Sequence, residues 1–464
     1  MTEWVTKVLA EYAISTSFDE YPIEVVDRAK MFLLDTLGCM IGGLDTPLGK
    51  SMLQTIKKAG SGGRATIVGS SVKSSITDAA LLNGTTANAL DFEETLAGLG
   101  HPSGTVISAA LAIGESRGIS GRDLLDAIIV GYDVGNRVGR AIQPTYERLK
   151  AVWCVGTWQT FGAVSAGCKC LGLDIGRTLN AYGIAGATAP LPNTQKWGWE
   201  LAERPIHWVK EPTGWPSWAG VLAALLAEDG FVGNRYILDG ERGFWAMAGS
   251  DRCNFDLMTK NLGSDYEVLE LSMKPYSCCR WQHAALDCLT ELIAAHRLKP
   301  SDVVSVDIYS FDWVKDFEVY RPVDMVDAEF SFPHSVTMIL HGVEPGPRWF
   351  EQSALRNEEL SNYSRRVRVY FDSYFNDLYH QQGKIGAKVE VKLSSGAVVT
   401  SSVETPRGDP TKPLTRDHIE RKFRSLAEPV LGPSASAEIV ELINDLDRQQ
   451  SLERLMALLV PTKE

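Results

Sequence analysis

The sequence predicts a mainly α-helical protein: a large all-helical domain with an inserted, smaller α+β lid domain. Three observations predict it. The chain has 464 residues, which is more than one ordinary domain. Apolar residues recur with a helical period over residues 1–265 and again over residues 410–464. Residues 266–409 instead carry alternating and β-branched runs, so we expect them to form the lid.

The helical domain begins with clear helix signals. "PIEVVDRAKMFLLDTLGCMIGG" (22–43) has a proline to open a helix and a glycine pair to close it. "SGRDLLDAIIVGYDVGNRVGRAI" (120–142) repeats this scheme with Ser120 as the N-cap. "TFGAVSAGCKCLGLD" (160–174) and "SWAGVLAALLAEDG" (217–230) are rich in small residues, which is typical of closely packed core helices. Only "RATIVG" (64–69) indicates a short strand here.

The lid is predicted from strand patterns. Strands are expected at 303–311, 365–372, 387–396 and 397–404, and the last two are joined by a Ser-Ser-Gly turn. "AEFSFPHSVTMILHG" (328–342) predicts a helix between them. The tail after residue 410 returns to helical patterns.

Composition excludes several classes of function. The net charge of −12 argues against a nucleic-acid partner, and an anionic substrate would need a local basic site. The opening residues lack a basic segment followed by an apolar one, and the longest apolar run (218–227) is half of the ~20 residues that span a membrane. The cysteines lie in apolar stretches without metal-ligand spacing. We therefore expect a cytoplasmic protein with reduced thiols, no membrane contact and no metal.

One segment places several charged residues directly before an apolar helix. In "DFEETLAGLGHPSGTVISAALAIGE" (91–115), Asp91, Glu93, Glu94 and His101 precede a helix of small residues that should be buried. Charge is costly at such a place, so the segment is either part of a functional site or a solvated surface loop.

Four segments carry a family resemblance. They are "NGTTANALDFEETLAGLGHPSGTVISAALAIGE" (83–115), "AGVLAALLAEDGFVG" (219–233), "LSMKPYSCCRWQHAALDCLTEL" (271–292) and residues 328–342. In this order, over nearly the whole chain, they resemble the MmgE/PrpD family. Its members include 2-methylcitrate dehydratases, cis-aconitate decarboxylases and iminodisuccinate epimerases. The resemblance implies a helical domain with an α+β lid, usually a homodimer, acting without a cofactor on small polycarboxylates.

The resemblance also implies site residues. Asp91, Thr95 and His101 match the positions around the reacting centre, and on a helix Asp91 and Thr95 would share a face. Ser103 begins the next helix, whose N–H groups suit a substrate carboxylate. Lys274 and Lys210 match two pocket lysines that would bind carboxylates. Glu93 and Glu94 are as well explained by solvated or supporting acids.

Further candidates follow from the same comparison of motifs. His283 matches a family histidine, with a structural role as the alternative, and Arg280 could clamp a carboxylate. His334 stands where decarboxylase-like members carry a tyrosine, and it could donate a proton. Many members have a histidine before the helix that begins near residue 160, but this chain has Trp158 and Gln159 there. We expect Trp158 to form an apolar wall of the substrate pocket and Gln159 to bring a neutral amide to it.

These observations predict a cofactor-independent lyase. Removing a proton next to a carboxylate needs a positioned base and groups that stabilise the resulting anion. Either Asp91 or His101 is the base, and the substrate is a small di- or tricarboxylate that is dehydrated or hydrated. An epimerase, a decarboxylase and a non-catalytic carboxylate-binding relative are the alternatives.

Overall fold

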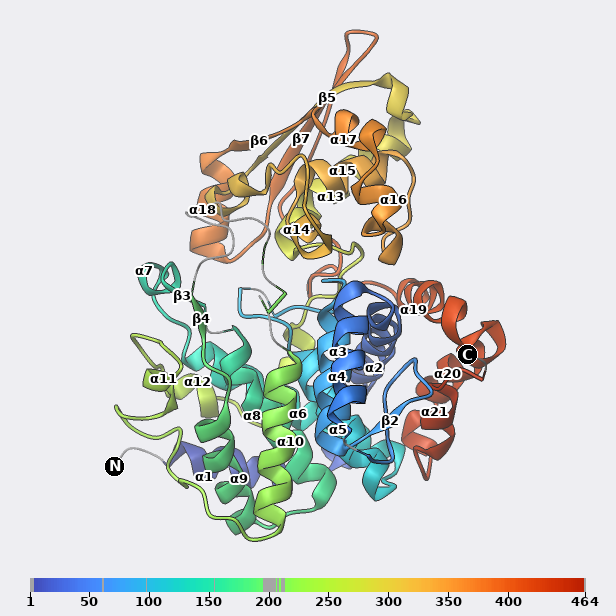
Figure 1. Cartoon of the computed structure of the whole chain (residues 1–464). Helices are drawn as coiled ribbons and strands as arrows, with labels where there is room; N and C mark the ends of the chain where they lie inside the picture. Colours follow the sequence, from blue (N-terminus) through green and yellow to red (C-terminus); the bar gives the residue numbers. More distant parts are fainter. Residues whose placement is uncertain are drawn as a thin grey trace.

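The computed structural model describes residues 4–462 except 61, 97, 154, 195–205, 207 and 210–212. The fold is mainly α-helical (Figure 1). One part consists of packed helices, and the other, at the top of Figure 1, contains a four-stranded sheet flanked by helices. One large buried apolar cluster fills the helical part, and a second fills the sheet-containing part and extends to residues of the helical part such as Cys39, Leu90 and Leu426. The boundaries expected at residues 266 and 409 stay a prediction.

The helical part is built from two stretches of the chain. Its longer N-terminal helices are α1 (Val5–Ser15), α2 (Ile23–Leu44), α3 (Pro47–Ala59), α4 (Ile76–Asn88), α5 (Pro102–Arg117), α6 (Gly121–Ala141), α8 (Val155–Leu171), α9 (Ile175–Thr188) and α10 (Gly214–Glu228). Short helices are α7 (Tyr146–Leu149), α11 (Phe244–Met247) and α12 (Asp256–Thr259). The C-terminal helices are α19 (Arg416–Leu431), α20 (Pro433–Asn444) and α21 (Glu453–Leu458). Two-residue strands pair β1 (Ala65–Thr66) with β2 (Lys73–Ser74) and β3 (Val152–Trp153) with β4 (Asn193–Thr194).

Small residues let the central helices approach closely. Helix α6 crosses α8 at glycines, and a Cβ added to Gly135 would lie 2.8 Å from Gly162 Cα. Ser120 caps α6 as predicted, because its hydroxyl accepts the Asp123 N–H while the Asp123 carboxylate accepts the Ser120 N–H. Helix α5 is buried from Pro102 to Gly114. Because α5 is buried on all sides, the charged side chains of the segment that precedes it need hydrogen-bond or ion-pair partners within the protein.

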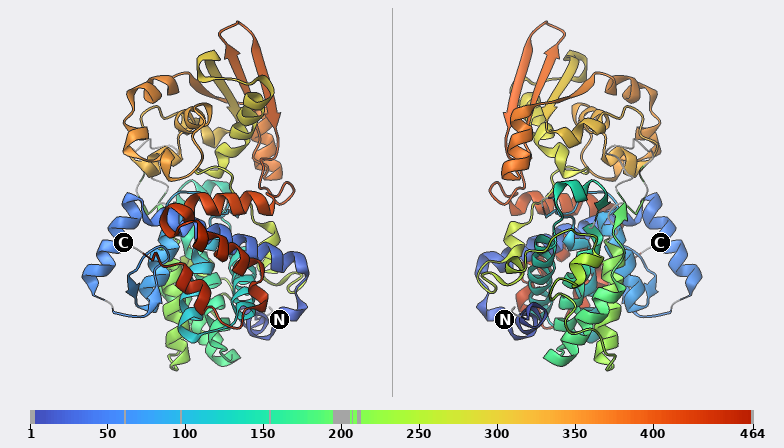
Figure 2. Two further views of the ribbon diagram at one scale, coloured as in Figure 1. Left: turned by 90° about the vertical axis from the view of Figure 1, so that its right-hand side faces the viewer. Right: turned by 90° about the vertical axis from the view of Figure 1, so that its left-hand side faces the viewer.

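The C-terminal helices pack against the N-terminal stretch. Helix α19 lies along α2, and Figure 2 shows the C-terminal helices covering the helical part. Helix α2 ends at Leu44, directly after the glycine pair predicted to close it. Gly42 faces α19, since an added Cβ would meet Leu426 Cδ2 at 2.8 Å, and Gly43 faces Thr86 of α4. These glycines therefore also allow close contact between helices.

The second part holds the predicted strands. They are β5 (Val303–Ser310), β6 (Val367–Phe371), β7 (Ala387–Leu393) and β8 (Val398–Val403), in the order β6-β5-β7-β8. Only β5 and β6 are parallel, and β7 and β8 form the expected hairpin. Its helices are α13 (His283–His296), α14 (Met325–Glu329), α15 (Phe332–Leu340), α16 (Gln352–Leu355), α17 (Glu358–Ser364) and α18 (Ser373–Gln382). Helix α13 packs on β7 and β8, while α15 packs on β6.

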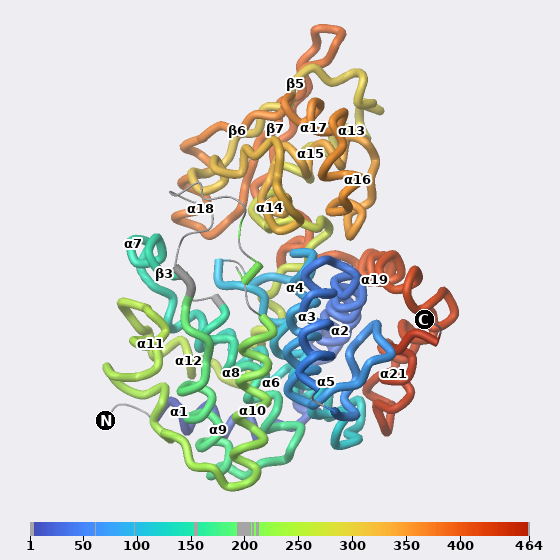
Figure 3. Tube along the Cα trace, in the orientation of Figure 1, coloured from blue at the N-terminus to red at the C-terminus, as the bar shows by residue number. Residues whose placement is uncertain are grey.

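The chain crosses between the parts twice, before α13 and after β8 (Figure 3). The two crossings are hydrogen-bonded to each other, because Met273 N–H donates to Gly408 O at 2.8 Å. The loop between α4 and α5 joins them, as Thr95 and Ser272 exchange backbone hydrogen bonds of 2.8 and 2.9 Å. Three distant segments therefore meet at this junction. In the described ranges, no helix is both long enough and apolar enough to cross a membrane.

Candidate active site

The loop between α4 and α5 is not helical, in contrast to the prediction for Asp91 and Thr95. Asp91 has a φ of 45°, a left-handed conformation that is uncommon for a residue with a side chain. The loop closes on itself, because Leu96 N–H donates to Gly100 O at 2.8 Å and Thr95 Oγ1 donates to the same oxygen at 3.1 Å. Thr95 thus stabilises the loop. Backbone strain of this kind is concentrated at functional sites.

Asp91 and Lys274 form a buried ion pair. Lys274 Nζ lies 2.5 Å from Asp91 Oδ1 and 2.7 Å from the Asp91 carbonyl oxygen. The left-handed backbone of Asp91 presents both oxygens to the same ammonium group. Lys274 is fully buried and Asp91 is 1% exposed. The ammonium group pairs with the charged carboxylate and so offsets the cost of burying it.

His101 lies between two carboxylates. Its Nδ1 is 2.7 Å from the Glu94 carbonyl oxygen and 3.2 Å from Glu93 Oε1, and its Nε2 is 3.6 Å from Asp91 Oδ1. Since both groups near Nδ1 accept hydrogen bonds, we assign the proton of the neutral ring to Nδ1. Nε2 is then the basic nitrogen. A proton that arrives there would make an imidazolium with carboxylates on both sides, which stabilise it.

Glu94 occupies the N-terminus of α5. The Ser103 N–H, expected to bind a substrate carboxylate, donates to Glu94 Oε1 at 2.6 Å, and the Ser103 hydroxyl is hydrogen-bonded to Tyr132. The Ser103 N–H and hydroxyl therefore already have partners within the protein, and substrate binding by Ser103 stays a prediction. Burial, and secondly the charge of Glu93, raise the pKa of Glu94 from 4.5 to about 7. Sequence reasoning missed this role, although an acid shortly before a helix start is its usual signal.

Glu93 is held by the end of α4. Its Oε1 accepts a hydrogen bond from Asn88 Nδ2 at 2.5 Å, and its side chain is fully buried. Asn88 thereby orients the carboxylate that faces His101 Nδ1. The alternative of solvated surface acids is excluded by this burial.

Trp158 and Gln159 do not form the expected pair of pocket contacts. The Trp158 ring is 1% exposed and packs against Gly139 of α6, where an added Cβ would lie 2.7 Å from the ring. Trp158 belongs to the helical core, because the first turns of α8 turn this position toward α6. Gln159 is also buried, and its Oε1 accepts a hydrogen bond from Thr105 Oγ1 at 2.7 Å.

Arg280 and His283 are structural. The Arg280 guanidinium donates to the carbonyl oxygens of Arg407, at 2.7 Å, and Pro406, at 3.4 Å, so it fastens the second crossing rather than a substrate. His283 Nε2 lies 3.1 Å from Cys278 O, and its Nδ1 lies 3.2 Å from Arg280. Burial, and secondly the charge of Arg280, lower the pKa of His283 far below 6.5. The His283 ring is therefore neutral, which agrees with the structural role given above as the alternative to substrate binding.

His334 lies at the start of α15 in the sheet-containing part. Its Nε2 lies 2.8 Å from Trp349 O, and burial lowers the pKa of its imidazole to about 4. Lys210 lies outside the described residues.

Three of these side chains could also approach a cation. Among the described residues, Asp91, Glu93 and His101 offer ligand atoms within 4.8 Å of one another. The Lys274 ammonium already pairs with Asp91 Oδ1. One of the three candidate ligands is thus paired with an ammonium group.

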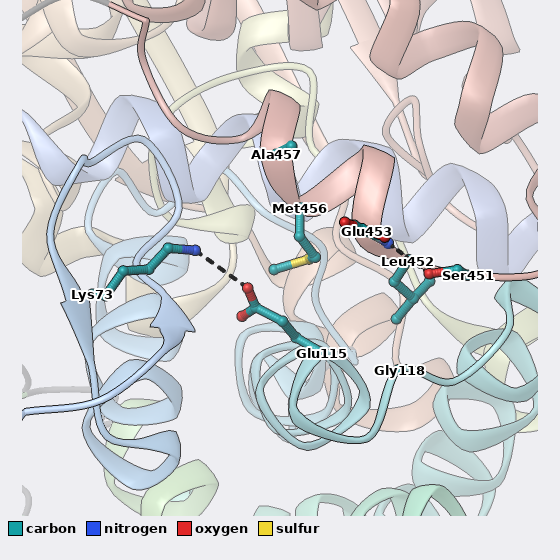
Figure 4. A pocket seen from close by; sticks show the side chains of 8 residues that line it. All are labelled: Lys73, Glu115, Gly118, Ser451, Leu452, Glu453, Met456 and Ala457. Carbon is teal, nitrogen blue, oxygen red and sulfur yellow. Dashed lines mark hydrogen bonds and ion pairs between the residues drawn. The ribbon is translucent and has the colours of Figure 1, made fainter.

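Two cavities are lined by residues outside this cluster. One, of about 310 Å³, is lined by Gly98 at the tip of the site loop and by Tyr146, Trp313, Tyr379 and His380. The other, of about 390 Å³, lies between β2, α5 and α21. Its Lys73 and Glu115 point toward one another and form an ion pair of 3.3 Å (Figure 4). That pairing leaves the second cavity without a reactive centre comparable to His101.

A buried histidine thus lies between two carboxylates where the helical and the mixed parts meet. The sequence profile of the MmgE/PrpD N-terminal domain matches residues 7–255, and that of the MmgE/PrpD C-terminal domain matches residues 276–448. The chain belongs to the MmgE/PrpD family.

Full-length relatives support this membership. Human cis-aconitate decarboxylase is 27% identical over 455 residues, covering 94% of this chain and 90% of the relative. Cis-aconitate decarboxylase of Aspergillus terreus is 26% identical over 487 residues, covering 98% and 96%. The mouse cis-aconitate decarboxylase is 26% identical over 453 residues, covering 93% and 89%.

Proposed function

We propose that this protein is a cofactor-independent lyase that moves a proton at a carbon next to a carboxylate of a small di- or tricarboxylate. The observation that carries the proposal is the position of His101 between Asp91 and Glu93. A proton taken up at His101 Nε2 would give an imidazolium with a carboxylate on each side, as a proton carrier at this place requires.

The exposed fractions of the three residues suggest which of them a substrate would contact first. His101 is 5% exposed, whereas Asp91 is 1% and Lys274 is 0% exposed. A substrate would therefore meet the His101 ring first, with the Asp91–Lys274 pair behind it. In this proposal Lys274 holds Asp91, and Lys210 is the cation that binds a substrate carboxylate.

Two reactions suit this arrangement. In dehydration, His101 takes the proton from the carbon next to the carboxylate, the electron pair forms the double bond, and hydroxide leaves as water after protonation. In decarboxylation, carbon dioxide leaves with cleavage of the carbon–carbon bond, and the protonated ring donates a proton to the resulting carbanion. The names of the relatives favour decarboxylation of cis-aconitate, and the sequence motifs alone favour dehydration. Both reactions need the same proton carrier.

Proton NMR in deuterated water tests the proposal. The purified protein, treated with EDTA, is incubated with cis-aconitate, citrate and other small acids of the succinate type. We expect deuterium at the carbon next to a carboxylate together with loss or gain of water or release of carbon dioxide. Exchange with inversion but without bond cleavage would instead indicate an epimerase.

Binding without chemistry is the other alternative. An acid that raises the thermal midpoint, yet shows neither exchange nor cleavage, would identify a non-catalytic carboxylate-binding protein. A ligand at 100 times its dissociation constant adds about 2.7 kcal/mol, which such an assay detects easily.

A further inference from the structure

We propose that Lys422 of α19, together with Asp35 of α2, is a positioning residue for the Asp91–Lys274 pair. As a role in catalysis, this inference rests on the proposed function. It concerns a C-terminal helix that carries none of the motif residues.

The close crossing of α2 and α19 brings the two side chains together. A Cβ added to Gly38 would lie 3.2 Å from Phe423 Cα, and one added to Gly42 would lie 2.8 Å from Leu426 Cδ2. The helices can approach this closely because these positions of α2 have no side chain. Lys422 consequently enters the interior and lies 2.7 Å from Asp35 Oδ1.

The Lys422 ammonium also contacts two backbone carbonyls of the site. Its Nζ lies 2.5 Å from Phe92 O and 3.1 Å from Lys274 O. It lies 3.9 Å from the centre of the Phe92 ring as well, which is the distance of a cation–π contact. The ammonium group thus donates hydrogen bonds to two carbonyls, while the Asp35 carboxylate pairs with its charge without hydrogen-bond geometry.

These contacts hold both members of the Asp91–Lys274 pair. Phe92 follows Asp91 directly, and the second carbonyl belongs to Lys274 itself. The Lys422 ammonium therefore holds the backbone next to Asp91 and the backbone of Lys274, the two residues whose side chains form the ion pair. His101 Nε2 lies 3.6 Å from that same oxygen, so a shift of either backbone changes the environment of the proposed base.

Charge supports the same role. Burial raises the pKa of Asp35, and the charge of Lys422 works against that increase. The neighbouring Glu93 and Lys274 also act on Asp35, so the pair is electrostatically coupled to the site. An ion pair with a purely structural role, elsewhere in the helical part, would lack this electrostatic coupling to Glu93 and Lys274.

The chain contains such a pair as a matched control. Lys30 of α2 is also buried, forms an ion pair with Asp447 and donates to Asn444 O at 2.9 Å. It likewise joins α2 to the C-terminal stretch, but it contacts neither Asp91 nor Lys274 in the described structure. Both pairs can be neutralised in the same way, as Lys422→Met/Asp35→Asn and Lys30→Met/Asp447→Asn. Replacing both partners leaves no uncompensated buried charge, so each variant has a fair chance of folding.

Two measurements compare the variants. The first is steady-state kinetics on the acid that the wild type converts. We expect kcat of Lys422→Met/Asp35→Asn to fall at least about tenfold with KM changed less than about threefold, since a misplaced reacting group lowers turnover. The control should lose thermal stability to a similar extent but keep its kcat.

The second measurement does not depend on activity. Histidine labelled with ¹⁵N reports the tautomer and protonation of His101, whose signals are assigned by their loss in His101→Gln. We expect these signals to move in the Lys422 variant and to stay in the control. If the wild type converts no acid, the proposed function fails, yet the spectra still test the positioning of His101. Unchanged His101 signals in the folded Lys422 variant, or wild-type kcat in it, would overturn the inference.

Discussion

The Lys274 ammonium holds both the carboxylate and the backbone carbonyl of Asp91, a residue 183 positions away in the sequence. The pair joins the loop after α4 to the first crossing between the two parts. It also sets the charge on the oxygen that faces His101 Nε2. Stability and chemistry therefore depend on the same contact.

Removing one partner of this pair should be costly. We expect Lys274→Met to lower the free energy of unfolding by about 3–5 kcal/mol, because it leaves an uncompensated buried carboxylate. Lys274→Met/Asp91→Asn should recover a large share of that loss. Urea denaturation measures both values. Lys50→Met, which removes the exposed pair with Asp45, serves as the control and should change stability by less than about 1 kcal/mol.

Glu94 should make stability fall as the pH rises. Its pKa is raised in the folded protein, so between pH 4.5 and about 7 the folded state holds a proton that the unfolded chain has released. Stability from this group is thus fully present below pH 4.5 and is lost as the pH rises through about 7. The Gln of Glu94→Gln can still accept the Ser103 N–H and does not titrate. We expect its stability relative to wild type to increase over this range, by up to about 3 kcal/mol.

Denaturation of both proteins at pH 5, 6, 7 and 8 measures that difference. Other buried acids, such as Asp133, titrate equally in the two proteins and cancel in the comparison. A difference that is constant with pH would show that Glu94 is ionised throughout.

Tyr146 should hold the two parts together. Its ring stacks on Trp313 at 5.3 Å, and its hydroxyl accepts a hydrogen bond from Trp313 Nε1 at 2.6 Å. Since a stacked aromatic pair contributes about 0.5–1.5 kcal/mol, Tyr146→Ala should speed amide exchange roughly two- to tenfold in residues 312–317 and 373–382. Hydrogen-exchange mass spectrometry measures this.

Tyr146→Phe is the matched variant, because it keeps the stacked ring and loses only the hydroxyl. We expect it to show a smaller increase in the same segments. Equal protection in wild type and Tyr146→Ala would mean that other contacts hold the parts.

Local sequence patterns predicted much of the fold and part of the site. The helical period, the strand alternation and the Ser120 cap all depend on neighbours a few residues apart, and the structure confirms them. The motifs around Asp91, His101 and Lys274 located side chains that the structure brings together. Short-range patterns are sufficient for such features.

Features set by distant contacts were missed or misassigned. Spacing could not show that Trp158 faces α6 or that Arg280 binds the second crossing, because both depend on tertiary packing. Lys422 did leave a signal in the sequence. It lies with Ile419, Phe423 and Leu426 on what is otherwise an apolar helix face, where a lysine requires a buried partner.

The exchange activity of His101→Gln tests the central claim most directly. Deuterium incorporation from solvent next to the substrate carboxylate is followed by NMR for wild type and variant, with the fold of the variant checked by its thermal midpoint. If His101 carries the proton, exchange should fall by about 10²–10⁴-fold, the usual range for a positioned acid or base. A folded His101→Gln protein that exchanges at near the wild-type rate would contradict the account.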